Sequence, residues 1–385
     1  MPRISKSQPF AIHIEDEVLA DLQERLSKTR WPGELPGSEW DYGTNLAYLK
    51  GLTDYWRTKY DWRVQEKALN EFHHYRATID GLGIHFLYEP GKGPNPLPLI
   101  MSHGWPGSFY EFAKVIRPLT DPGSFGGDPA DAFDVIIPSI PGYGFSDPPQ
   151  ERGFNNQRVS DIFARLMTDI LGYTRFGTQG GDWGSFVATQ IGFTFPEHVI
   201  GIHLNMIAAI PHPENRKNLS SSEERFLKQS KHFLQEEAGY QGIQGTKPQT
   251  LAYGLNDSPA GLAAWIVEKF RTWSDCDGDV ERRFTTDELL TNIMIYWLTS
   301  TINSSCRLYY ENRHHPWWVG KEERVTTPTG VAVFPREIIR PPKEWAERVY
   351  NIQRWTEMPR GGHFAAMEEP ELLVEDIQAF FRGLR

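Results

Sequence analysis

The chain alternates between short apolar runs and longer stretches in which apolar residues recur at helical spacing. Apolar runs at 97–101, 133–137, 173–178 and 199–206 predict buried strands. Helical spacing at 159–171 and at 186–195 predicts helices between them. Strands that alternate with helices are typical of a mostly parallel sheet covered on both faces. We therefore expect an α/β fold whose functional loops lie at the carboxyl ends of the strands.

The same patterns divide the chain into four sections, 1–90, 91–210, 211–325 and 326–385. The first begins with amphipathic helices and ends in a hairpin that starts the core. The second and fourth carry the alternating strands and helices, and so form the two halves of one core. The third lacks clear strand signals and is rich in aromatic residues. It predicts a helical cap inserted between strands of the sheet.

Composition narrows the possible functions. The 385 residues are 39% hydrophobic and include 13 Trp, 15 Tyr and 22 Phe, enough for a large core and an aromatic pocket. The net charge of −10, without a long basic run, argues against nucleic acid as a partner. With no recognisable signal peptide or membrane-spanning run, we expect a soluble, cytoplasmic protein without a membrane anchor. Cys276 and Cys306 have no metal-ligand spacing and predict buried, inert thiols.

The strongest chemical signal is the sequence Gly180-Gly181-Asp182-Trp183-Gly184-Ser185, between a predicted strand and a predicted helix. A strand, a tight turn and a helix, with small residues around the turn, make up a nucleophile elbow. Elbows usually carry Ser, whereas here the reactive position is Asp182, and a carboxylate that attacks carbon forms an ester. The simpler alternative is a Gly-Gly-Asp turn that only reverses the chain. Because Ser185 would lie on the helix, a serine esterase is disfavoured.

Three further motifs follow predicted strands: His103-Gly104-Trp105-Pro106, Phe334-Pro335-Arg336-Glu337 and Gly361-Gly362-His363-Phe364. Asp182, Glu337 and His363 thus occur in the order nucleophile, acid, histidine that α/β-hydrolases use. Side chains at the carboxyl ends of neighbouring parallel strands can converge on one site. Glu368 and Glu369 are nearer to His363 in sequence, but they lie past it at an expected helix start and are poorer candidates for the acid.

Taken together, these motifs point to a family. The chain resembles epoxide hydrolases of the α/β-hydrolase superfamily, in the branch that is similar to microsomal epoxide hydrolase. The resemblance covers nearly the whole chain, through the motifs around Trp105, Asp182 and His363 and the segment Leu255-Asn256-Asp257-Ser258-Pro259. It implies an α/β-hydrolase fold with a helical cap, and conversion of an epoxide and water to a vicinal diol without a cofactor or metal ion. We expect the chain to differ from the mammalian microsomal enzymes in having no N-terminal membrane anchor.

The resemblance extends to the N-terminal section, which is similar to the meander that wraps the core in this branch. We expect it to clasp the cap, through Trp31 and Trp40, and to supply no catalytic group. The family's pattern also implies a cis peptide bond before Pro106. A homodimer formed cap to cap is compatible with the resemblance, but no residue argues for it.

The resemblance implies a catalytic triad. Asp182 attacks an epoxide carbon and becomes an alkyl ester. His363 then deprotonates the water that hydrolyses this ester, a task that suits a group with a pKa near neutrality. Glu337 orients His363 and stabilises its imidazolium form.

The resemblance also implies groups that stabilise or neutralise the negative charge that develops on oxygen. The backbone N–H groups of Trp105 and Trp183 form an oxyanion hole. Two tyrosines of the cap, Tyr240 and Tyr309, protonate the epoxide oxygen. Tyr310 is the rival of Tyr309, because a one-residue error in register exchanges the two.

Two other functions remain as alternatives. A haloalkane dehalogenase also uses an elbow Asp with a His, but it has no use for a pair of ring-opening tyrosines. Tyr240 and Tyr309 therefore favour the epoxide. A non-catalytic small-molecule-binding protein on a hydrolase scaffold would not need an intact Asp182, Glu337 and His363. The predicted partners are a small epoxide, aryl or alkyl in view of the aromatic cap, and water.

Overall fold

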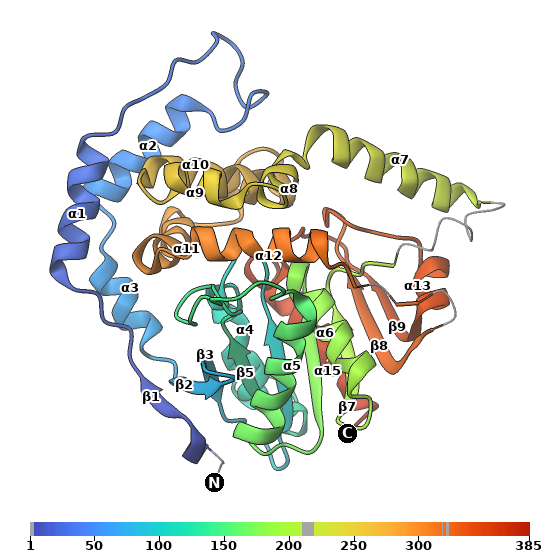
Figure 1. Ribbon diagram of the computed structural model, residues 1–385. Coiled ribbons are helices and arrows are strands. Elements are labelled where there is room, and N and C mark those ends of the chain that lie inside the picture. Colours follow the sequence, from blue (N-terminus) through green and yellow to red (C-terminus); the bar gives the residue numbers. More distant parts are fainter. Residues whose placement is uncertain (1–3, 210–218, 318, 321–322) are drawn as a thin grey trace.

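The computed structural model describes residues 4–209, 219–317, 319–320 and 323–385 (Figure 1). The strands in this part are β1 (Gln8–Phe10), β2 (His74–Ile79), β3 (Leu82–Glu89), β4 (Leu97–Ser102), β5 (Phe133–Pro138), β6 (Phe176–Gly180), β7 (Val199–Leu204), β8 (Val325–Val333) and β9 (Tyr350–Glu357). They form a sheet in the order β1-β2-β3-β5-β4-β6-β7-β8-β9. Pairing is antiparallel from β1 to β5 and parallel from β5 through β4 to β9. The expected α/β-hydrolase fold with a mostly parallel sheet is confirmed.

Helices cover this sheet in three groups. The N-terminal section has α1 (Asp16–Ser27), α2 (Leu46–Thr58) and α3 (Trp62–Leu69). The core has α4 (Ala113–Thr120), α5 (Asn156–Arg165), α6 (Asp182–Thr194), α13 (Lys343–Val349), α14 (Ala365–Glu368) and α15 (Pro370–Arg382). Between β7 and β8 lie α7 (Ser221–Glu236), α8 (Gly239–Gln244), α9 (Pro248–Leu255), α10 (Pro259–Trp273), α11 (Thr286–Thr299) and α12 (Ile302–His314). In Figure 1 the helices α8 to α12 lie above the sheet, as the predicted cap should.

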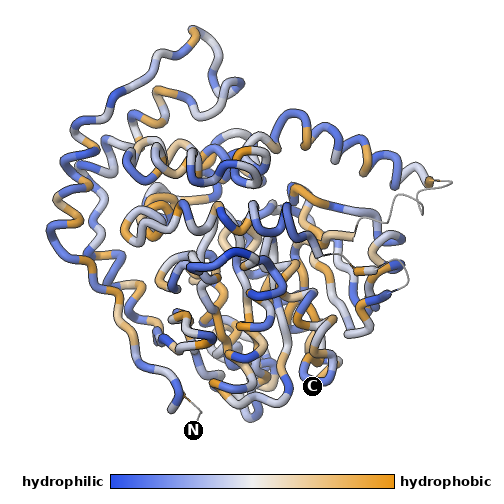
Figure 2. The backbone as a smooth tube through the Cα atoms, viewed as in Figure 1, coloured by the Kyte–Doolittle hydropathy of each residue, from blue (hydrophilic) through white to orange (hydrophobic). Residues whose placement is uncertain are grey.

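The core follows the hydrophobic pattern of the sequence. Every residue of β7 is buried, as expected for a central parallel strand covered on both faces. Figure 2 shows hydrophobic segments concentrated in the central strands and the helices against them, while α7 is largely hydrophilic. Cys276 and Cys306 are buried free thiols, as predicted. No helix among the described residues is long and apolar enough to cross a membrane.

The N-terminal section runs along one side of the molecule and reaches the cap (Figure 1). The Thr44 hydroxyl donates to the carbonyl of Ala264 at 2.7 Å. The Arg271 guanidinium lies over the Trp40 ring, 4.4 Å from its centroid. The predicted clasp through Trp40 is therefore confirmed, whereas the cation that faces Trp31 is Lys50 of the same section.

Candidate active site

The predicted elbow lies between β6 and α6. Asp182 has φ of +47°, the left-handed region that a residue with a side chain rarely adopts. A Cβ on Gly180 would lie 2.1 Å from the Gly184 carbonyl oxygen, and one on Gly184 would lie 1.9 Å from that of Ser102. The glycines are thus required by close backbone contacts at the turn. The helix begins at Asp182, four residues before the predicted start, so Ser185 lies on it as expected.

The three predicted triad residues converge. His363 Nε2 lies 3.3 Å from Asp182 Oδ2, and His363 Nδ1 lies 2.7 Å from Glu337 Oε1. Glu337 Oε1 also accepts from the backbone N–H of Ile338 at 2.6 Å. The backbone N–H of His363 donates to the carbonyl of Trp273, at the end of α10 in the cap, at 2.9 Å. Glu337 of the core therefore orients the imidazole, while the cap helps to hold the backbone of His363.

Burial and neighbouring charges shift the pKa of His363 in opposite directions. Burial disfavours its charged form, but the carboxylates of Glu337 and Asp182 raise its pKa well above the ordinary value. The two carboxylates therefore favour the protonated form of the imidazole in the free protein. Conversion of Asp182 to a neutral ester would remove one of these two carboxylates. The same event would thus help His363 to become the neutral base that water activation needs.

The loop after β4 reaches the elbow. The backbone N–H of Trp105 donates to Asp182 Oδ1 at 2.9 Å, and the Trp105–Pro106 bond is cis, as expected. Two residues of α11 hold this loop: Asn292 donates to the carbonyl of Pro106 at 2.8 Å, and Tyr296 to that of Gly107 at 2.6 Å. The sequence analysis missed both, because no local signal marks an α11 residue as a partner of so distant a loop.

Trp183 directly follows Asp182 on α6, the position at which an elbow presents its second N–H donor. Its ring meets that of Tyr309 edge to face, with centroids 4.8 Å apart. Trp183 thus borders the same space as the cap tyrosines, and its role as oxyanion donor stays a prediction.

The two predicted cap tyrosines face each other above the elbow. The ring centroids of Tyr240, on α8, and Tyr309, on α12, are 5.8 Å apart. Burial raises the pKa of both hydroxyls, so both remain protonated donors. Tyr310 instead stacks on His314, with centroids 3.9 Å apart. Of the two adjacent tyrosines, Tyr309 is the one that faces the site.

A cavity of about 310 Å³ lies between the elbow and the two cap tyrosines. Asp182, Tyr240 and Tyr309 line it together with apolar side chains that include Phe186 and Met206. Its volume suits a small ligand, and its walls favour an apolar one. In the described ranges, His, Cys, Asp and Glu side chains form no group of three or more that could hold a metal ion.

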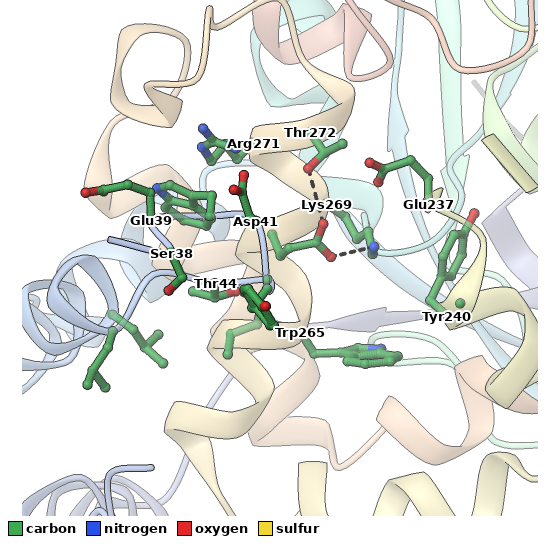
Figure 3. Close-up of a pocket in the computed structure, with 18 of the residues that line it drawn as sticks. Ser38, Glu39, Asp41, Thr44, Glu237, Tyr240, Trp265, Lys269, Arg271 and Thr272 are labelled. Atoms are coloured by element: carbon green, nitrogen blue, oxygen red, sulfur yellow. Dashed lines mark hydrogen bonds and ion pairs between the residues drawn. The ribbon is translucent and has the colours of Figure 1, made fainter. Parts of the chain in front are cut away.

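A larger cavity, of about 1190 Å³, lies between the N-terminal section and the cap (Figure 3). Tyr240 borders both cavities, and the Lys269 ammonium lies 5.0 Å from the centroid of its ring. Lys269 is paired with Glu268. We assign the chemistry to the smaller cavity, because Asp182 lines it and does not line the larger one.

Known proteins resemble the chain over almost its full length. The family described as "Epoxide hydrolase N terminus" matches residues 7–112, and "alpha/beta hydrolase fold" matches residues 98–245. A putative epoxide hydrolase of Stigmatella aurantiaca is 48% identical over 98% of this chain and 85% of that protein. Epoxide hydrolase 1 of Sus scrofa is 43% identical over 97% of this chain and 88% of that protein. The crystal structure of juvenile hormone epoxide hydrolase from Bombyx mori has a TM-score of 0.89 at 33% identity, covering 98% of this chain and 95% of that one.

Proposed function

Because this chain belongs to the epoxide hydrolase family, we propose that it converts an epoxide and water to a vicinal diol through a covalent ester on Asp182. The observation that carries the proposal is the position of the Asp182 carboxylate. One oxygen accepts from the Trp105 N–H at 2.9 Å, and the other lies 3.3 Å from His363 Nε2. A carboxylate in this position can act first as nucleophile and then, as an ester, as the target of a water activated by His363.

In the first half-reaction an Asp182 oxygen attacks one epoxide carbon from the side opposite the ring oxygen. The bond between that carbon and the ring oxygen breaks, and its electron pair goes to the oxygen. Tyr240 and Tyr309 are the proposed proton donors to this oxygen, since both hydroxyls are protonated and both residues line the cavity with Asp182. The product is a hydroxyalkyl ester of Asp182.

In the second half-reaction His363 takes a proton from a water molecule, whose oxygen attacks the ester carbonyl carbon of Asp182. The Trp105 N–H faces the oxygen on which negative charge develops, and Trp183 is the proposed second donor. Glu337 holds the imidazole through Nδ1 and stabilises its charged form. The bond between the ester carbon and the alkyl oxygen breaks, and the imidazolium of His363 protonates that oxygen, so that the diol leaves. The carboxylate is restored with one oxygen from water, and the remaining proton of that water returns to the tyrosine that protonated the epoxide oxygen.

Replacing both cap tyrosines tests directly whether the substrate is an epoxide. In Y240F/Y309F the ring oxygen has lost both proposed proton donors, so diol formation from styrene oxide should fall at least about 10³-fold. Each single variant should retain part of the activity, because the other hydroxyl still lines the cavity. Chiral chromatography of the diol measures the rate and the product together.

Y310F is the matched control, since Tyr310 packs on His314 and does not line the cavity. It should keep the wild-type rate within about threefold. Halide release from a chloroalkane is assayed in parallel. Rapid halide release with little diol would favour the haloalkane dehalogenase instead. Full diol formation by the double variant would contradict the role of the two tyrosines.

Replacing Glu337 by Gln should change both the rate and the pH dependence of ester hydrolysis. The Glu337 carboxylate raises the pKa of His363 more than any other group does. Without that charge the His363 pKa falls, so the neutral base forms at lower pH and the rising limb of the hydrolysis profile moves to lower pH. The plateau should fall by about 10²- to 10⁴-fold, because the imidazolium formed during water activation loses its partner. Stopped-flow measurement of single turnovers across pH shows whether the limb moves downward; an upward or absent shift would contradict this role.

A further inference from the structure

Two side chains that contact Tyr240 have no role in the proposed mechanism. The first is Gln241, the next residue of α8, whose side-chain amide donates to the Tyr240 hydroxyl oxygen at 2.9 Å. Adjacent residues of a helix do not normally face each other, so this contact requires that both side chains turn into the same space. That space is the smaller cavity, which both residues line together with Asp182.

The hydrogen bond from Gln241 determines where the hydroxyl proton of Tyr240 can go. A phenolic oxygen can accept from one partner while it donates to another, whereas a side-chain amide N–H can only donate. With Gln241 as the donor, the Tyr240 hydroxyl keeps its own hydrogen for a second partner. An epoxide oxygen in the cavity can be that partner.

The second side chain is a buried cation against the ring of the same tyrosine. Lys269 Nζ, on α10, lies 5.0 Å from the centroid of the Tyr240 ring (Figure 3) and 5.7 Å from that of Trp273. Only 5% of Lys269 is exposed, and Glu268 of the same helix pairs with its ammonium, as burial of a lysine requires. The pair keeps the positive charge beside the Tyr240 ring.

We propose that Gln241 and Lys269 are positioning residues that make Tyr240 the proton donor in ring opening, an inference that rests on the proposed function. As the bond between the epoxide carbon and the ring oxygen breaks, Tyr240 gives its proton to that oxygen and becomes a phenolate. The Gln241 N–H then faces a charged oxygen, and the Lys269 ammonium faces a ring into which the charge spreads. Both interactions strengthen in the transition state, so both lower the barrier.

The charge on Asp182 changes in the direction that assists this step. Burial raises the pKa of the Tyr240 hydroxyl most, and the Asp182 carboxylate raises it further, whereas Gln241 and Tyr309 act to lower it. Attack on the epoxide converts Asp182 to a neutral ester. Its repulsion of the Tyr240 phenolate therefore disappears while that phenolate forms.

Tyr309 lies in a different environment. Its ring contacts those of Trp105, Trp183 and Tyr240, with centroids 5.9, 4.8 and 5.8 Å away. Burial raises the pKa of its hydroxyl well above the ordinary value, and Tyr240 acts in the same direction. Tyr309 thus keeps its own proton and supports the Tyr240 phenolate as a hydrogen-bond donor.

Single-turnover kinetics test these roles with Gln241→Met and Lys269→Met, which remove the amide donor and the cation at nearly constant length. Enzyme in excess is mixed with styrene oxide, and the Asp182 ester is followed by quenched-flow mass spectrometry. We expect ester formation about tenfold slower in each variant, and ester hydrolysis within about twofold of wild type. Gln241→Glu should be slower still, because a carboxylate accepts the hydrogen of the Tyr240 hydroxyl and turns it away from the epoxide.

The dependence on Tyr240 separates these roles from a general loosening of the cap. Each Met substitution is repeated in Y240F and in Y309F. In Y240F neither should slow ester formation further, because the hydroxyl that Gln241 and Lys269 act on is absent. In Y309F each should still slow it about tenfold.

Two further variants serve as controls for the cation. Lys269→Arg retains the charge and should recover most of the wild-type rate of ester formation. Arg271→Met is the matched control, since Arg271 lies on the same helix and borders the same larger cavity, but its guanidinium lies over the Trp40 ring. It should form the ester at the wild-type rate.

The outcomes are distinct. Selective slowing of ester formation in Q241M and K269M that requires Tyr240 supports the inference. An unchanged rate of ester formation in either folded variant, or equal slowing with Tyr240 and with Y240F, overturns it and leaves the proposed function intact. If K269M does not fold by circular dichroism, Q241M and Q241E decide alone. Absence of any ester in wild type and in H363Q would instead refute the proposed function.

Discussion

Asp182→Asn should lose essentially all diol formation, on the order of 10⁵-fold or more, while the protein stays folded. The amide is nearly the same size as the carboxylate, and it keeps an oxygen that can accept from the Trp105 N–H. It lacks the negative charge that attacks an epoxide carbon, so no ester forms. Initial rates with styrene oxide measure the loss of diol formation, and the thermal unfolding temperature shows whether the variant stays folded.

Asp182→Ala is the companion variant, because an Asn beside an activated water can be hydrolysed back to Asp and an Ala cannot. Both variants should be inactive when freshly prepared, and only the Asn variant can regain activity with time. Substantial diol formation by the Ala variant would show that water attacks the epoxide without Asp182.

His363→Gln should stop the reaction after its first half. The variant keeps the nucleophile but loses the base, so the ester of Asp182 should form and persist, with hydrolysis at least about 10³-fold slower than in wild type. Intact-protein mass spectrometry should show an increase equal to the mass of the epoxide. Digestion should locate that mass on the peptide that contains Asp182.

The His103→Gln variant is the control for this experiment. His103 lies in the same region, but burial lowers its pKa to about 4, so it is neutral, and its Nε2 accepts from the backbone N–H of Ile140 at 3.2 Å. We place it outside the catalytic groups and expect no persistent ester. If H363Q released diol without a detectable ester while H103Q accumulated one, the assignment of the base would be wrong.

The elbow could be predicted from sequence because its signals are local. Backbone contacts at the turn leave no room for a Cβ on the glycines around Asp182. The spacing of these glycines can therefore be recognised in the sequence. The positions of Glu337 and His363 followed from the rule that loops at the carboxyl ends of parallel strands share one edge of the sheet. The helix start was placed four residues late, since apolar spacing begins only at Phe186 and Gly184 obscures the first turn.

Features that depend on packing between distant segments could not be predicted. Sequence spacing alone does not separate Tyr309 from Tyr310; the family resemblance selected Tyr309, and the orientation of α12 directs it to the cavity and Tyr310 to His314. Asn292 was missed for the same reason, because its partner is a loop of the core.

The central claim is that the oxygen added to the epoxide comes from Asp182 and not directly from solvent. A single turnover in ¹⁸O-labelled water, with enzyme in excess over epoxide, tests it. The account predicts that the first diol carries no label and that one ¹⁸O atom appears in the peptide containing Asp182. A diol labelled in that first turnover, with an unlabelled Asp182, would contradict it.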